Sequence, residues 1–319
     1  MTQTRRTDNR AMHLMIPHAS ALGDACAHTL SHLTLPHLAE LLGLLKPSGA
    51  PVGSDEYSFH TPIEQALAAL RGAAPGSLPT AAWLAQAAAL DRGEAWALLT
   101  PIHLSVGSDQ ITALAPEALQ LDAAESQAMF ATLAELWPAA EGWRSAWLAP
   151  MQWLIAHPSL VGLRSASLDR VIARSVDTWM PEARRLRTLQ NEVQMLLHNS
   201  ALNDAREARG LRPVNSVWIS GCGVASGSEL PVGLLIDERL REPLMSGDWA
   251  AWAEAWGALD AGPVADLLAR AKADQPVSLT LGGERLAQTW AMPPRGGLLR
   301  LWQGLVPPRA HAAKLLEAL

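Results

Sequence analysis

The feature that most constrains the fold is the interleaving of strand-like and helix-like segments along the whole chain. Segments 12–17, 95–105 and 214–220 are apolar and of strand length, and the segments between them repeat apolar residues with a helical period. Segment 276–290 has the pattern of a hairpin about a Gly-Gly turn. This order predicts an α/β or α+β fold, in which helices flank a mixed sheet.

The domain organisation follows from length and from loop composition. A chain of 319 residues is long enough for one large domain or two small ones. We expect residues 1–10 to be disordered and residues 11–319 to form a single α/β domain, with any division into two lobes near 158–181. The segment 46–62 is rich in Pro, Gly and Ser, which predicts a long loop that is functional or mobile.

Charge and hydropathy disfavour several classes of protein. The net charge is −6, and the basic cluster Arg184, Arg185 and Arg187 is typical of a solvated helix face, so we expect no nucleic-acid partner. No uncharged apolar run reaches 18 residues and no signal peptide is recognisable, so we expect no membrane partner. Two distant cysteines fit a reducing compartment, and a cytoplasmic protein is expected.

Three residue types could carry chemistry outside any motif. The 13 tryptophans are spread over the chain, which favours core packing over the stacking of a sugar or base. His28 and His32 are four residues apart and would share a helix face suited to zinc, although a set of surface histidines is the favoured interpretation. Cys222, between two glycines, is either an exposed thiol or a small residue in a tight turn, and we favour the turn.

The most polar segment of the chain is 198–223, where a helix, a short second helix and a strand are expected in succession. Arg206 could bind a phosphate or carboxylate through two hydrogen bonds. One hypothesis is therefore a polar pocket formed by Gln194, His198, Asn203, Arg206, Asn215 and Trp218. The alternative, which spacing alone favours, is a helix–strand junction whose polar side chains satisfy buried backbone groups.

The same segment carries a resemblance to a known family. The matching residues are Asn191, Glu192, Gln194, Met195, Leu197, His198, Asn203, Arg206, Asn215, Ser216, Trp218, Gly221 and Gly223. In this pattern the chain resembles the RpfE-type regulatory proteins of proteobacteria, whose members often carry the name phosphoglycerate mutase. The resemblance is specific across 191–223 and weaker elsewhere. It implies a regulatory role and adds Ser216, Gly221 and Gly223 to the predicted ligand-binding residues.

The segment is also similar to part of the archaeal-type, cofactor-independent phosphoglycerate mutases. That similarity implies that Arg206 contacts a phosphoglycerate, but Ser220 stands where those enzymes place an arginine. Their metal-binding Asp-Gly and Asp-His-Gly elements are not present in this sequence. We therefore expect a degenerate mutase-like scaffold without catalysis, metal or cofactor. Its partner would be a small anionic metabolite or a protein, and its oligomeric state is left open. A divergent mutase or phosphatase and a scaffold protein are the alternatives.

Overall fold

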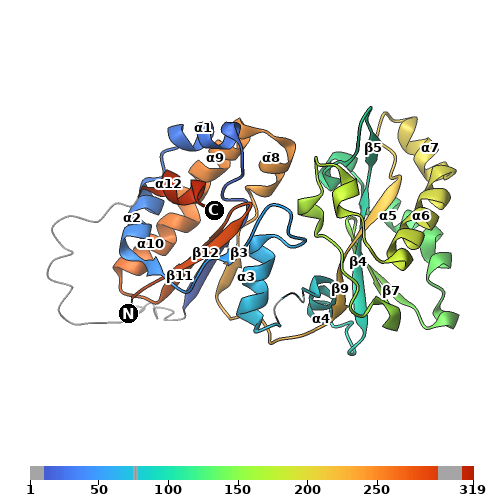
Figure 1. The fold of residues 1–319 in the computed structure, drawn as a ribbon, viewed down its shortest axis with the longest axis horizontal. Helices are drawn as coiled ribbons and strands as arrows, with labels where there is room; N and C mark the ends of the chain where they lie inside the picture. The colour runs from blue at the N-terminus through green and yellow to red at the C-terminus, as the bar shows by residue number, and fades with distance from the viewer. Residues whose placement is uncertain (1–10, 75, 77, 294–310) are drawn as a thin grey trace, which may run out of the picture. The chain divides into compact units, whose positions relative to one another are not determined.

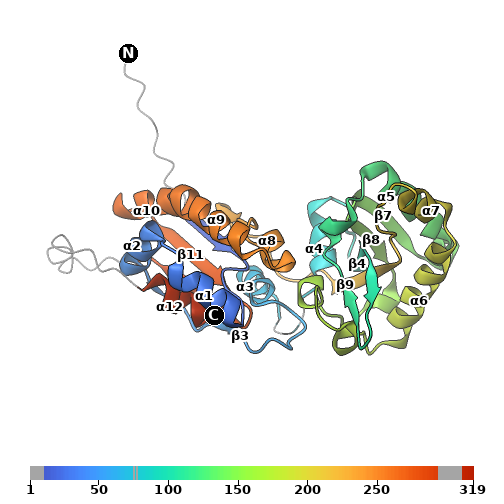
Figure 2. The same cartoon turned by 90° about the horizontal axis from the view of Figure 1, so that it is seen from above.

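The computed structural model describes residues 11–74, 76, 78–293 and 311–319, and Figures 1 and 2 show their arrangement in two views. The chain forms two compact units. Unit 1 consists of Met1–Glu56, Gln65–Leu70 and Glu229–Leu319, and unit 2 of Tyr57–Glu64 and Arg71–Ser228. The segment 158–181 lies inside unit 2, so the chain does not divide there. The N-terminal residues 1–10 lie outside the described residues, and their expected disorder stays a prediction.

Unit 1 is built on a mixed sheet with the strand order β10-β1-β11-β12-β2, in which β3 also pairs with β12. The strands are β1 (Met12–Ile16), β2 (Lys46–Pro47), β3 (Val52–Gly53), β10 (Leu234–Ile236), β11 (Val277–Gly282) and β12 (Leu286–Ala291). Strand β1 pairs in parallel with both β10 and β11, whereas β11 and β12 form the expected antiparallel hairpin. The short strands β2 and β3 occupy part of the segment that was expected to be a loop.

The helices of unit 1 bury one face of this sheet. They are α1 (Asp24–His32), α2 (Pro36–Leu44), α8 (Arg241–Ser246), α9 (Trp249–Leu259) and α10 (Ala265–Lys272), followed by α12 (Ala312–Glu317). Trp252 and Trp256 of α9 are fully buried in a core with Leu14 of β1 and Leu279 of β11. A π-helical turn containing Pro263 joins α9 to α10 without breaking the helix. The predicted core role of tryptophan is confirmed here.

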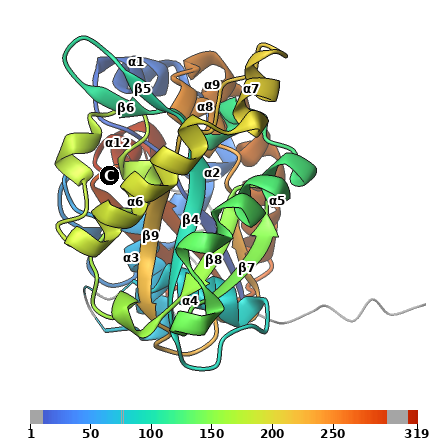
Figure 3. The ribbon, with the colours of Figure 1, turned by 90° about the vertical axis from the view of Figure 1, so that its right-hand side faces the viewer.

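Unit 2 is built on an antiparallel sheet with the order β7-β8-β4-β9. Its strands are β4 (Ala95–Ile102), β7 (Arg144–Ala149), β8 (Gln152–Ala156) and β9 (Ser216–Val224), and β5 (Leu104–Val106) with β6 (Ile111–Ala113) forms a separate hairpin. Helices α5 (Ala123–Thr132), α6 (Arg184–His198) and α7 (Ala201–Glu207) lie on one side of the sheet and α4 (Thr80–Ala87) on the other (Figures 1 and 3). Helix α3 (Pro62–Arg71) contributes residues to both units. The predicted mixed α/β class is confirmed.

The structure bears on two local expectations. Helix α6 begins at Arg184, after Ala183 in extended backbone, and Arg184, Arg185 and Arg187 are exposed, as expected for a solvated helix face. The Gly-Cys-Gly sequence is not a corner after the strand, since β9 continues through it to Val224 with positive φ at both glycines. Strand β4 has a register shift opposite these residues, between Trp96 and Leu98, which accommodates the irregular backbone.

No described helix is both long enough and apolar enough to cross a membrane.

Candidate functional site

The segment with the family resemblance forms the end of α6, all of α7 and most of β9. Helix α6 packs on β9 through Leu186, Leu189, Val193 and Leu197, which are buried on its inner face. Helix α7 ends at Glu207, and Gly210, two residues after the C-cap Ala208, has a left-handed conformation (φ 73°) before the chain enters β9. The local sequence therefore places every predicted site residue on one helix–helix–strand junction.

Arg206 has a fully buried side chain at this junction. Its Nε donates to the Arg212 carbonyl oxygen at 3.0 Å and one terminal nitrogen donates to Glu125 Oε2 at 2.5 Å. The other terminal nitrogen donates to the Leu119 carbonyl oxygen. Burial lowers the pKa of the guanidinium, and the nearby Asp122 carboxylate opposes that shift. The guanidinium thus ties α7 to α5 and to the turn before α5.

Glu125 lies in the first turn of α5 and links this helix to α7. Asp122 caps α5 by accepting a hydrogen bond from the Glu125 backbone N–H at 2.8 Å. The Glu125 carboxylate does not complete a capping box, because it is paired with Arg206 and with the more exposed Arg209. The Glu125 carboxylate therefore makes a long-range ion pair with Arg206 instead of a local contact at the start of α5.

Two asparagines hold the chain on either side of the α7–β9 connection. Asn203 donates to the carbonyl oxygens of Leu197 and Val214, both at 2.9 Å, and accepts from the Val214 N–H at 2.9 Å. Asn215 pairs with the backbone of Leu104, accepting from its N–H at 2.7 Å and donating to its carbonyl oxygen at 2.9 Å. Each amide imitates a peptide group and satisfies buried backbone atoms.

The remaining predicted site residues do not converge on one cavity. Gln194 Nε2 donates to Ser216 Oγ at 3.2 Å, and Trp218 Nε1 donates to the Ala166 carbonyl oxygen at 2.8 Å. His198, the last residue of α6, is exposed and stands apart from them. The geometry of these residues matches the alternative of a junction. Their ligand-binding role stays a prediction.

Gly221 and Gly223 allow close packing of β9 against α4. At Gly221 (φ +63°) a Cβ would lie 2.1 Å from Thr80 Oγ1 and 2.8 Å from the Ala81 backbone nitrogen. At Gly223 (φ +146°) a Cβ would lie 3.1 Å from Pro79 Cβ. The glycines therefore have a packing reason, which is the approach of a helix N-terminus to a strand.

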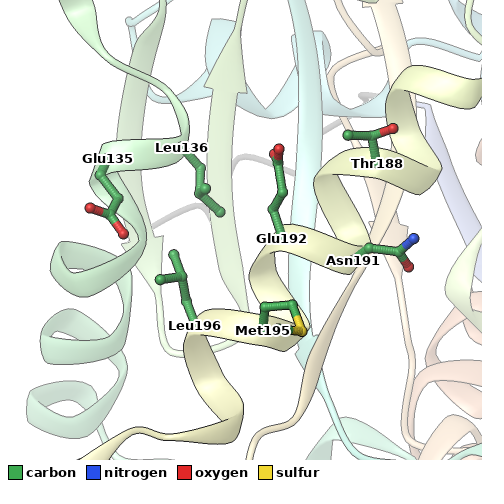
Figure 4. A pocket seen from close by; sticks show the side chains of 7 residues that line it. All are labelled: Glu135, Leu136, Thr188, Asn191, Glu192, Met195 and Leu196. Atoms are coloured by element: carbon green, nitrogen blue, oxygen red, sulfur yellow. The ribbon is translucent and has the colours of Figure 1, made fainter.

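The exposed part of the motif lines a groove between α6 and the 3₁₀ turn η2 (Leu133–Leu136), shown in Figure 4. The groove has a volume of about 380 Å³. Its lining residues are Glu135, Leu136, Thr188, Asn191, Glu192, Met195 and Leu196. Three of them, Asn191, Glu192 and Met195, belong to the family resemblance but were not among the predicted ligand residues. The signal that could have found them is their position on the polar face of a helix whose other face is buried.

The groove combines apolar and acidic groups. Met195 is 71% exposed, which is unusual for a large apolar side chain. Figure 4 shows Leu136 and Leu196 between the carboxylates of Glu135 and Glu192. No lysine or arginine is among the lining residues. An apolar floor with two carboxylates favours a ligand that is apolar and positively charged.

A second polar cluster, which the sequence did not predict, lies partly in the loop segment 46–62. Arg170, almost fully buried, donates to Ser58 Oγ at 3.1 Å and to the His60 carbonyl oxygen at 3.0 Å. Burial lowers the pKa of His60 to about 4, and the charges of Arg164 and Arg170 add to the shift. Burial also raises the pKa of Glu64, whose Oε2 accepts from the Thr61 N–H at 2.7 Å in a capping box. The cluster anchors the start of α3.

Cys222 and the pair His28 and His32 were the candidates for thiol and metal chemistry. Cys222 is a free, half-buried thiol, and burial raises its pKa to about 11, which is the behaviour of a packing residue rather than of a nucleophile. His28 and His32 do share one exposed face of α1, with ring centroids 4.6 Å apart. Among the described residues, no group of three or more His, Cys, Asp or Glu side chains is placed to hold a metal ion.

Comparison with known proteins gives limited support to the resemblance. No protein-family model and no curated protein matches the sequence. The cofactor-independent phosphoglycerate mutase from Thermoplasma acidophilum is similar in structure at 12% identity and a TM-score of 0.36, over 91% of this chain and 92% of that chain. The PH0037 protein from Pyrococcus horikoshii is similar at 11% identity and a TM-score of 0.46, over 96% and 92%. TM-scores below 0.5 do not establish a shared fold, so the RpfE-type assignment stays a prediction.

Proposed function

We propose that this chain is a non-catalytic, regulatory-type binding protein that docks a protein partner in the groove between α6 and η2. The observation that carries the proposal is the division of the family-like segment into two sets of residues. The polar groups of Asn203, Arg206 and Asn215 are used in internal hydrogen bonds. Asn191, Glu192 and Met195 instead face solvent and line a groove.

The chemistry of the groove defines the partner segment. Leu136, Met195 and Leu196 offer an apolar surface, and methionine adapts its shape to the side chain that packs on it. Glu135 and Glu192 supply negative charge on this surface. The occupant that fits is a protein segment with apolar side chains next to lysine or arginine, such as one face of a basic amphipathic helix.

An anionic metabolite is less well supported as the ligand. The predicted anchor, Arg206, donates from Nε and from both terminal nitrogens to acceptors of its own chain. The groove carries carboxylates, which would repel an anion. The alternative of a mutase has a direct test, because metal-supplemented conversion of 3-phosphoglycerate to 2-phosphoglycerate by tag-free protein would contradict a non-catalytic function.

The proposal is tested with a panel of synthetic helical peptides whose Leu face is flanked either by Lys or by Glu. We expect the Lys peptides to bind the full chain in fluorescence anisotropy and the Glu peptides not to bind. Met195→Asp should abolish binding, and Glu192→Lys should weaken the Lys peptides at least tenfold. Raising the salt concentration should weaken binding as well, because the charges lie at the surface.

The matched control is Val106→Asp, which places the same charge at another apolar side chain of unit 2 that is 78% exposed. It should bind the Lys peptides as the unchanged protein does. Equal binding by the Met195→Asp and Val106→Asp variants, or no preference for Lys over Glu peptides, would refute the groove as the docking site.

A further inference from the structure

A second exposed feature lies in unit 1, on α1, and is independent of the groove. Helix α1 buries Cys26 and Leu30, while His28, Ser31 and His32 face solvent. Because His28 and His32 are four residues apart, their side chains are neighbours on the helix surface. Their imidazole centroids are 4.6 Å apart at an interplanar angle of 50°.

The hydrogen bonds of His32 fix the state of its ring. His32 Nδ1 lies 2.9 Å from the His28 carbonyl oxygen, which can only accept, so Nδ1 carries the proton. Ser31 Oγ lies 3.0 Å from the same nitrogen and itself donates to the His28 carbonyl oxygen at 2.7 Å. In the neutral imidazole the lone pair is therefore on Nε2. A backbone carbonyl that holds the other ring N–H is the usual support of a metal-binding histidine.

We propose that His28 and His32 form a two-imidazole site for a divalent transition-metal ion, with water completing the coordination. No hydrogen bond to the His28 ring nitrogens is present among the described residues, and the exposed ring can turn its lone pair toward that of His32. His32 is the last residue of α1, where the helix dipole favours a cation, and His28 lies one turn before it.

Imidazole nitrogen donors determine which metal ions the site is expected to bind. Imidazole nitrogen suits Cu²⁺, Ni²⁺ and Zn²⁺, and Cu²⁺ binds most tightly to a given nitrogen site. Two nitrogen donors at adjacent corners fit the square-planar preference of Cu²⁺ better than the four-ligand tetrahedral preference of structural Zn²⁺. The second imidazole binds intramolecularly, so the pair should exceed a single histidine in affinity by tenfold or more.

The test uses tag-free full-length protein titrated with CuCl₂ by calorimetry, together with electron paramagnetic resonance of the bound Cu²⁺. We expect one tight Cu²⁺ per chain, with coupling to two imidazole nitrogens, and weaker binding of ZnCl₂. His28→Ala and His32→Ala should each lower the affinity at least tenfold and leave coupling to one imidazole. Both positions are exposed, so circular dichroism should be unchanged.

The control is His198→Ala, which removes another exposed histidine from the end of a helix. It should keep the affinity and the spectrum of the unchanged protein. The proposal is overturned if no tight Cu²⁺ binds, if either α1 variant keeps two-nitrogen coupling, or if His198→Ala loses the site.

Discussion

Replacing Arg206 with Met gives the sharpest test of the junction at the end of α6. The change keeps much of the apolar volume of the side chain but removes donors to the Leu119 and Arg212 carbonyl oxygens and to Glu125. Arg206 is fully buried, so its acceptors are left inside the protein. If it were instead a ligand anchor, the fold would tolerate the change.

The expected loss of unfolding free energy follows from the burial of Arg206 and its acceptors. Removing one partner of a buried ion pair costs about 3–5 kcal/mol, and each buried acceptor left unpaired costs about 1–3 kcal/mol. Glu125 keeps Arg209 as a partner, which lowers the cost of breaking the ion pair. We therefore expect a loss of about 3–5 kcal/mol, against a total stability of about 5–15 kcal/mol for a typical domain.

The assay is urea unfolding followed by hydrogen exchange with mass spectrometry, which reports separately on peptides of each unit. Arg209→Met is the matched control, because Arg209 pairs with the same carboxylate but has a half-exposed side chain. It should cost about 1 kcal/mol or less. An Arg206→Met protein whose unit 2 is as stable as that of Arg209→Met would refute the structural role and leave the guanidinium available for a ligand.

Three further outcomes are expected. Gly221→Ala should lower the melting temperature far more than Gly210→Ala, because both have positive φ but only Gly221 has Thr80 Oγ1 within 2.1 Å of the new Cβ. Cys222 should react slowly with Ellman's reagent at pH 8 in the folded protein and rapidly in urea, since burial raises its pKa to about 11 from an ordinary 9.0. His60 has a folded pKa of about 4, below its ordinary 6.5, so the unfolded chain binds more protons between these values and stability should fall as pH drops from 6.5 to 4. Unfolding titrations at several pH values should show this loss reduced in His60→Gln.

The internal partners of Arg206 could not be predicted from the sequence. The sequence suggested Arg206 as a ligand for an anion. The acceptors that Arg206 actually meets, Glu125 and the Leu119 carbonyl oxygen, are more than 80 residues earlier in the chain. No local pattern encodes that approach, because it depends on how α5 and α7 pack.

For the fold as well, local features could be predicted from the sequence, whereas long-range contacts could not. Local periodicity was sufficient to predict several elements, including β1 and the β11–β12 hairpin. These features depend on residues within a few positions of one another, where propensity, turn chemistry and side-chain period act directly.

Long-range contacts were decided only by the tertiary structure. The division into units joins segments from both ends of the chain, with β1 pairing β10 and β11 more than 200 residues away. The Asp260 carboxylate likewise accepts hydrogen bonds from the backbone N–H groups of His37 and Leu38 at the start of α2. The sequence by itself determined which elements form and which residues are polar or apolar. Which polar groups meet, and which stay exposed in the α6 groove, depended on packing, because burial and pairing are properties of neighbours in space rather than in sequence.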